Sequence, residues 1–174
     1  MEIEKKTHQY IEEDYSKYEN GIYWVWSDVG RGKTESIKTC TKPTIITCGS
    51  NELGFQIHLR HPEIVKEIHK LNLSSATTKD IGWEEFEGFV NYESFHRLSK
   101  GTLPHFLVID EPAQLWKQAS LNLNTQANYD IFLHFLRWTP VVILLGYDQP
   151  HYIIEELEEI SQKRGDVFKQ IRYE

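Results

Sequence analysis

The segment SDVGRGKT, at residues 27–34, has the residue types and spacing of a phosphate-binding loop. It departs from the pattern G-x-x-x-x-G-K-[ST] at its first position, where serine replaces glycine. Gly30 and Gly32 would let backbone N–H groups face inward around an anion. Lys33 would reach the β- and γ-phosphates of a nucleotide, and Thr34 would hold Mg²⁺. The expected nucleotide-binding residues are Ser27, Asp28, Val29, Gly30, Arg31, Gly32, Lys33 and Thr34.

A pair of carboxylates, Asp110 and Glu111, ends the apolar segment FLVIDE at residues 106–111. Such a segment predicts a buried strand that presents these carboxylates at the sheet edge where open α/β sheets bind ligands. Asp110 would coordinate Mg²⁺, and Glu111 would act as the general base on the attacking water. A charged turn after a strand is common by itself. The glycine loop and the acidic pair together, in this order, predict binding of ATP or GTP. They also predict hydrolysis if Glu111 is correctly placed.

The elements that must position these residues alternate between strands and helices. Several strands are apolar on both faces, which favours a parallel sheet covered on both sides. Strands are predicted at 22–26, 43–48, 88–91, 105–111 and 139–147, and helices at 33–40, 52–71, 92–98, 128–138 and 151–165. Residues 72–88 look irregular, and the chain ends in a short tail. We expect a three-layer α/β/α sandwich, with residues 1–20 as a helix or arm and 21–174 as a single domain.

Composition narrows the classes of protein. The chain has 174 residues, and its 40% hydrophobic content supplies a core and excludes general disorder. A net charge of -7 argues against a surface coated in positive charge, although a local basic groove stays open. Two cysteines make neither a disulfide framework nor a metal-ligand spacing. With no apolar run near the roughly 18 residues of a membrane span, we expect a cytoplasmic protein without membrane partners.

The two motifs resemble those of superfamily-2 helicases and translocases. The first motif of that family is A-x-x-G-x-G-K-T, and residues 27–34 match it with serine in place of alanine. The second is D-E-x-[HD]; Asp110-Glu111-Pro112-Ala113 keeps the acidic pair and lacks the final His or Asp, which helps link hydrolysis to motion. In this family a small residue other than glycine is normal at the first position. The resemblance therefore implies that Ser27 belongs to a working loop.

Three further segments occupy the places of looser family motifs. TCGSNEL (47–53) stands where the family has a strand-to-helix motif of the P-T-R-E-L kind. YESFHRL (92–98) stands where a T-x-x-x-L-type motif contacts the nucleic-acid backbone, and helix-surface polarity is the alternative for this segment. ILLGYDQP (143–150) stands in place of the S-A-T motif, and Gln149 with Asp148 could sense the γ-phosphate there. The implied nucleic-acid residues are Ser50, Asn51, Tyr92, Ser94 and Arg97.

The resemblance implies the first RecA-like lobe of an ATP- and Mg²⁺-dependent helicase, most similar to viral and plasmid origin-of-replication-binding helicases. A second lobe or a neighbouring subunit would supply arginine fingers, and without them ATP hydrolysis would be slow. Lys163 and Arg164 are expected on a solvated helix surface. The implied partner is nucleic acid, with DNA preferred, in the host cytoplasm if the protein is viral. Two alternatives stay open: a stand-alone P-loop switch or packaging motor, and a non-catalytic nucleotide-binding adaptor.

Overall fold

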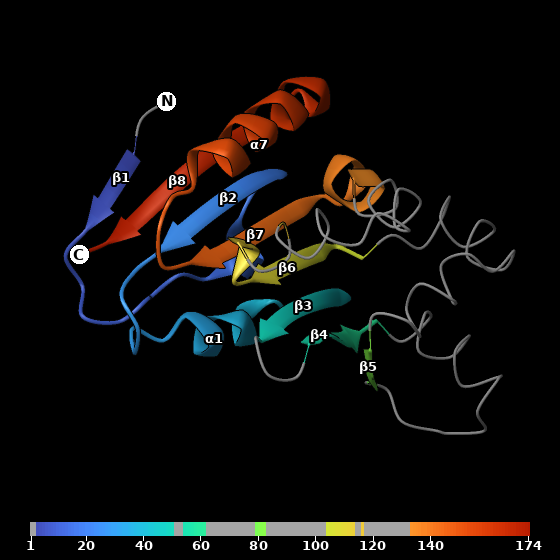
Figure 1. The fold of residues 1–174 in the computed structure, drawn as a ribbon, viewed down its shortest axis with the longest axis horizontal. Coiled ribbons are helices and arrows are strands. Elements are labelled where there is room, and N and C mark those ends of the chain that lie inside the picture. Colours follow the sequence, from blue (N-terminus) through green and yellow to red (C-terminus); the bar gives the residue numbers. More distant parts are fainter. Residues whose placement is uncertain (1–2, 51–53, 62–78, 83–103, 114–115, 117–132) are drawn as a thin grey trace, which may run out of the picture.

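The computed structural model describes residues 3–50, 54–61, 79–82, 104–113, 116 and 133–174. Within these residues, eight strands form one sheet in the order β1-β8-β2-β7-β6-β3-β4-β5 (Figure 1). The strands are β1 (Ile3–Lys6), β2 (Gly21–Trp26), β3 (Thr44–Ser50), β4 (Gly54–Arg60), β5 (Lys79–Gly82), β6 (Phe106–Asp110), β7 (Val141–Gly146) and β8 (Val167–Tyr173). Among them β4 runs antiparallel to both of its neighbours, β3 and β5, and the other pairs are parallel. The expected α/β class with a mainly parallel sheet is confirmed.

Helices lie on both faces of the sheet. One face carries α7 (His151–Arg164) and the helical residues 133–138, and the other carries α1 (Lys33–Ser36) followed by the 3₁₀ turn η2 (Ile37–Thr39). The crossover from β2 to β3 and the crossover from β7 to β8 run in opposite directions along the sheet. Because such crossovers are right-handed, their helices must lie on opposite faces, as Figure 1 shows for α1 and α7. This arrangement is compatible with three layers.

Alternation along the central strand β2 divides the core into two clusters. Ile22, Trp24 and Trp26 pack into the cluster that includes residues of α7. Tyr23 and Val25 point into the second cluster, on the face of α1 and η2. All five side chains are buried, and those of Ile22, Trp24 and Val25 are fully buried. A strand that is apolar on both faces therefore lies in the interior of the sheet, as its sequence predicts.

The N-terminal residues form part of the sheet rather than a separate helix or arm. β1 pairs parallel with β8, and a 3₁₀ turn, η1 (Tyr15–Lys17), follows before β2. Ile11 and Tyr15 pack into the second core cluster. α1 and η2 together span only residues 33–39. The N-terminal segment therefore adds to the layer that these two short elements form on their face of the sheet. The charged residues that suggest a surface helix instead belong to an edge strand, where charged side chains hinder pairing with a further strand.

Three other predictions are wrong in detail. The helix expected over 52–71 begins instead as β4, which forms an antiparallel hairpin with β3. β5 lies within the stretch predicted to be irregular, and the expected C-terminal tail is β8, an interior strand between β1 and β2. The sequence GFQIHLR of β4 alternates with the period of two that a strand requires. The strand at 88–91, the helix at 92–98 and residues 62–71 lie outside the described residues.

The end of α7 agrees in part with the solvated charged surface that we expect there, because Lys163 is exposed and Arg164 is not. The side chain of Arg164 is only 3% exposed and pairs with Asp166 at 2.9 Å. Its guanidinium donates to the carbonyls of Leu136 at 2.6 Å, Thr139 at 2.7 Å and Pro140 at 2.8 Å. These carbonyls lie where the helical residues 133–138 end and the chain turns into β7. Arg164 therefore holds two segments together and is not available as a surface cation.

A buried carboxylate ties β1, the N-terminal segment and β8 together. Glu13, whose side chain is 7% exposed, accepts hydrogen bonds from Lys6 Nζ at 2.7 Å and Tyr173 Oη at 2.7 Å. Tyr18 Oη donates to its other oxygen at 2.5 Å. Burial works to raise the pKa of Glu13, but the hydrogen bonds from Lys6, Tyr18 and Tyr173 outweigh it and lower the pKa. The ionised carboxylate therefore stabilises the folded state.

The substitution Glu13→Gln should test this contribution through its pH dependence. A lowered pKa stabilises the fold above the pKa of an unfolded glutamate, about 4.3, and the stabilisation is lost as the pH falls below it. At neutral pH we expect the variant to lose about 1.5–3 kcal/mol of unfolding free energy in denaturant titrations. The difference from wild type should shrink at acid pH. Glu12→Gln, at a side chain that is 70% exposed, is the control, and an equal loss there would contradict the assignment.

Candidate nucleotide-binding site

The loop between β2 and α1 takes a backbone conformation that its glycines allow. Gly30 and Gly32 have φ angles of 80° and 81°, in the left-handed region. A residue with a side chain would cost roughly 1–2 kcal/mol at such a position. Among the described residues, Glu111 alone has a positive φ without being a glycine, so Ser27 does not adopt one. The serine at the first position of the motif therefore fits the loop without strain.

Lys33 is folded back onto this loop. It is 7% exposed, and its Nζ donates to Ser27 O at 3.1 Å, Ser27 Oγ at 3.1 Å and Asp28 O at 2.9 Å. Burial lowers the pKa of Lys33, while the negative charges of Asp110, Asp28 and Glu111 act in the opposite direction. A partly desolvated ammonium group whose neighbours are carbonyls and carboxylates is well suited to exchange those contacts for an anion.

The loop meets the acidic pair through Thr34. Its Oγ1 donates to Asp110 Oδ2 at 3.4 Å, although 76 positions separate the two residues in the sequence. Burial raises the pKa of Asp110, with Glu111 adding to the shift and Thr34 and Lys33 opposing it. A cation placed between the hydroxyl and the carboxylate would relieve this cost. The structure therefore brings together the two residues that the sequence predicts as Mg²⁺ ligands.

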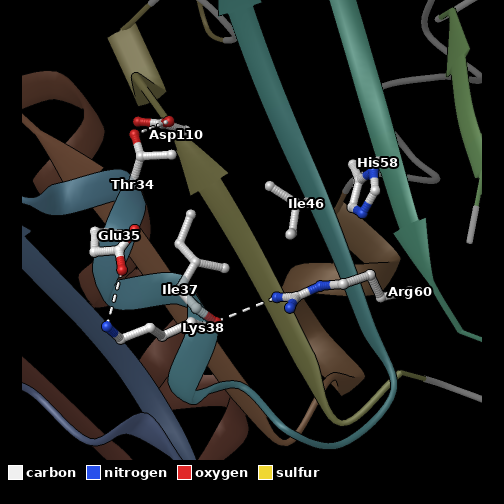
Figure 2. A pocket seen from close by; sticks show the side chains of 8 residues that line it. All are labelled: Thr34, Glu35, Ile37, Lys38, Ile46, His58, Arg60 and Asp110. Atoms are coloured by element: carbon white, nitrogen blue, oxygen red, sulfur yellow. Dashed lines mark hydrogen bonds and ion pairs between the residues drawn. The ribbon is translucent and has the colours of Figure 1, made fainter.

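A cavity of about 350 Å³ opens beside this pair, with α1 and η2 on one side and β3 and β4 on the other (Figure 2). Thr34 and Asp110 lie at one end of it. Towards the other end, Arg60 from β4 donates to the carbonyl of Ile37 at 3.2 Å. The lining residues are Thr34, Glu35, Ile37, Lys38, Ile46, His58, Arg60 and Asp110. The Thr34–Asp110 pair is therefore open to small molecules and ions from the solvent.

Glu111 lies at the same edge in an unusual backbone conformation. Its φ is 56°, and its N–H donates to Leu145 O at 2.9 Å, which extends the pairing with β7 by one residue. Its Oε1 accepts a hydrogen bond from Tyr147 Oη at 3.2 Å. A strained conformation at a residue of this type is a mark of functional sites.

Tyr147 is a site residue that the sequence analysis does not single out. Its ring centroid lies 4.0 Å from Lys33 Nζ, and its hydroxyl contacts Glu111. It directly follows β7, the strand that separates β2 from β6. Its position after β7 would indicate a site residue only when the strand order is known, because that order places β7 between β2 and β6.

Comparisons of the chain with protein-family models, with curated proteins and with solved structures gave no match. In the described part of the chain, no helix combines the length and apolar character needed to cross a membrane.

The other predicted nucleotide-binding residues divide into two groups. Asp28, Val29 and Gly30 are exposed at the top of the loop. Arg31 points away from Lys33: its guanidinium donates to His8 O at 3.3 Å, Gln9 O at 3.1 Å and Glu174 O at 3.3 Å. The side chain of Arg31 thus holds the loop against both ends of the described chain, and only its backbone remains for a phosphate.

Gln149 is turned towards β8. Its side-chain amide donates to Gln170, which is buried on that strand. The carbonyl of the preceding Asp148 accepts a hydrogen bond from Trp24 Nε1 at 3.1 Å. In this arrangement Tyr147, rather than Gln149, is the residue after β7 that faces Lys33 and Glu111.

Of the residues predicted to contact nucleic acid, one lies in the described part of the chain. Ser50 is the last residue of β3, the strand next to β6. Asn51, Tyr92, Ser94 and Arg97 lie outside the described residues.

The protein ligands for a metal ion are few. Among the described residues there is no group of three or more His, Cys, Asp or Glu side chains that could hold a metal. One hydroxyl and one carboxylate, from Thr34 and Asp110, fit Mg²⁺, which usually keeps several waters and binds through one or two carboxylates and the phosphates of a substrate. They do not make a dedicated cage for a tightly bound metal.

The substitutions Gly30→Ala and Gly32→Ala should show whether the left-handed loop conformation persists in solution. No atom lies within 4 Å of the position that a Cβ would take at either residue, so the cost is conformational. We expect each variant to lose roughly 1–2 kcal/mol of unfolding free energy in denaturant titrations. Val29→Ala, at a side chain that is 79% exposed, should change stability by less than about 0.5 kcal/mol. Unchanged stability in both glycine variants would contradict the described loop.

Proposed function

We propose that this chain is an ATP-binding, Mg²⁺-dependent RecA-like domain that hydrolyses ATP. The observation that carries the proposal is the contact of Thr34 Oγ1 with Asp110 Oδ2 at 3.4 Å. It joins the glycine loop to the acidic strand, two segments whose sequences separately predict phosphate and magnesium binding. Lys33 and Glu111, the two residues with expected chemical roles, are the direct sequence neighbours of this contact pair.

The strand order supports a nucleotide site at this place. In open α/β sheets, ligands bind outside the carboxyl ends of the strands, where successive crossovers depart in opposite directions. The chain leaves β2 towards β3 on one side, and it leaves β7 towards β8 on the other side. β2 and β7 are neighbours, so the point at which the direction changes lies between them. The loop that carries Lys33 starts at that point.

Each residue has a definite role in this proposal. Lys33 exchanges the carbonyls of Ser27 and Asp28 for the β- and γ-phosphates. Thr34 and Asp110 hold Mg²⁺, which neutralises the charge that develops on the phosphates. Glu111 accepts the proton of the attacking water.

The helicase part of the proposal rests on the motifs. SDVGRGKT and DEPA resemble the first and second motifs of superfamily-2 helicases, and both begin where a strand of the sheet ends. We propose that the domain acts on nucleic acid, with DNA preferred, in the replication of a virus, phage or plasmid. A second RecA-like lobe or a neighbouring subunit supplies the arginine fingers. Arg164, the last residue of α7, is held by Asp166 and three backbone carbonyls, so it is not available as such a finger.

Lys33→Ala and Glu111→Gln should separate binding from hydrolysis. Lys33→Ala should weaken ATP binding at least about tenfold, because it removes the cation that contacts the phosphates. Glu111→Gln should keep ATP affinity and reduce turnover about 10²- to 10⁴-fold, because the amide cannot accept the proton. Titration with a fluorescent ATP analogue measures the first effect, and phosphate release in the presence of Mg²⁺ measures the second.

Lys17→Ala provides the matched control for Lys33→Ala. Lys17 lies in the η1 turn, its side chain is 82% exposed, and it pairs with Asp14 on the protein surface. Its removal should leave ATP affinity unchanged. Equal ATP affinities of wild type and Lys33→Ala would refute the nucleotide site. Turnover that survives in Glu111→Gln would assign the base to another residue.

Nucleic acid should increase the rate of ATP hydrolysis. A helicase or translocase domain couples the two ligands, so single-stranded or duplex DNA added to the full chain should raise the rate of phosphate release. The measurement compares DNA, RNA and a polyanion such as heparin at equal phosphate concentration. Stimulation by none of them, combined with a rate that rises with protein concentration, would favour a self-assembling motor instead.

A further inference from the structure

Tyr147 is placed so that it contacts two residues with opposite charges and different roles. Its ring lies over the ammonium group of Lys33, with 4.0 Å between Nζ and the ring centroid. Its hydroxyl donates to Glu111 Oε1 at 3.2 Å. The side chain is 46% exposed, so these contacts form at the surface of the site rather than in the core.

The sheet determines this position. Trp26 at the end of β2 is paired with Gly146 of β7, and Asp110 at the end of β6 is paired with Leu145. The three strands therefore end within one residue of the same level, with β7 in the middle. The first residue beyond β7 must lie between the loop that follows β2 and the carboxylate that follows β6.

We propose that Tyr147 is a positioning residue that couples phosphate binding by Lys33 to the release of Glu111. This inference rests on the proposed function. In the conformation described here, Tyr147 holds Lys33 and Glu111 together as a latch. Phosphate binding opens the latch, and Glu111 then becomes free to orient the attacking water.

The contacts of Lys33 explain why phosphate binding must disturb the latch. A lysine ammonium group has three N–H donors. Ser27 O, Ser27 Oγ and Asp28 O lie within hydrogen-bond distance of Nζ and account for three acceptors. To reach a phosphate, Nζ must give up at least one of them and change its position relative to the ring of Tyr147. The attraction between cation and ring, which contributes to the position of the tyrosine, is then lost or weakened.

The contact with Glu111 explains the consequence for hydrolysis. Oε1 of Glu111 accepts from the tyrosine hydroxyl, so this lone-pair direction cannot accept a proton from water. Release of the hydroxyl restores it. Glu111 keeps its backbone position meanwhile, because its N–H is bonded to Leu145 O in the extension of the sheet. The latch therefore controls the side chain of the base without moving its backbone.

Two substitutions at Tyr147 separate the two contacts. Tyr147→Phe keeps the ring over Lys33 and removes the hydroxyl, so ATP affinity should stay the same while turnover without nucleic acid rises about tenfold. Tyr147→Ala removes both contacts, so it should also bind ATP about two- to thirtyfold more tightly, since Lys33 is no longer held by the ring. Both variants should fold, because the side chain is half exposed. Dissociation constants come from titration with a fluorescent ATP analogue, and kcat and KM from phosphate release.

Tyr152→Phe and Tyr152→Ala are the matched controls. Tyr152 is a surface tyrosine of α7 with an exposure of 58%, and its substitution should change neither quantity. A fall of kcat in Tyr147→Phe would overturn the latch, because the hydroxyl would then assist the reaction. Unchanged ATP affinity and unchanged kcat in both Tyr147 variants would overturn the latch as well. The same holds if wild type binds ATP without measurable turnover and both variants bind ATP equally well and also show no turnover. Failure of wild type to bind ATP would instead refute the proposed function itself, and the latch with it.

Discussion

The parallel pairing of β2, β7 and β6 is the constraint on which the candidate site depends. Backbone hydrogen bonds align Trp26 with Gly146 and Leu145 with Asp110, so three strands end at one edge. Asp110 ends β6, and Glu111 and Tyr147 directly follow β6 and β7. Lys33 and Thr34 begin α1, the helix after the loop that leaves β2. A shift of one residue in either pairing would turn the side chains beyond it to the opposite face of the sheet. The register of the sheet therefore sets the geometry of the site.

The site combines features that each cost free energy. Glu111 has a left-handed backbone conformation, and Lys33 and Asp110 are charged groups in partly desolvated surroundings. Two fully buried core clusters lie on either side of the same strands and hold these features in place. The packed core thus keeps the site strained in the absence of a ligand. This arrangement is expected where ligand binding relieves the strain.

The ends of the described chain support the loop from the other side. Arg31 donates to backbone carbonyls near β1 and to Glu174, and Ile11 N donates to Arg31 O at 2.9 Å. The network around Glu13 holds the same N-terminal segment against β8. The N-terminal segment thus does more than cover the sheet, because it fixes the outer side of the glycine loop while Lys33 holds the inner side.

The amino-acid sequence by itself predicted most of the residues to which we assign chemical roles, and the strands that carry them. A glycine loop and an acidic pair are local patterns, so their meaning depends on residue type and spacing within a few positions. The same holds for β2, β6 and β7, whose apolar runs need no knowledge of their neighbours. Predictions from composition were less successful, since β1 reads as a charged helix and β4 lies within an apparently helical stretch.

Only the tertiary structure decided which of these residues meet. It joined Thr34 to Asp110, turned Arg31 and Gln149 away from Lys33, buried Arg164 and brought Tyr147 between Lys33 and Glu111. The physical reason is that a contact between distant residues depends on strand order and register. Both arise from the packing of the whole sheet, and no short segment of the sequence contains that information.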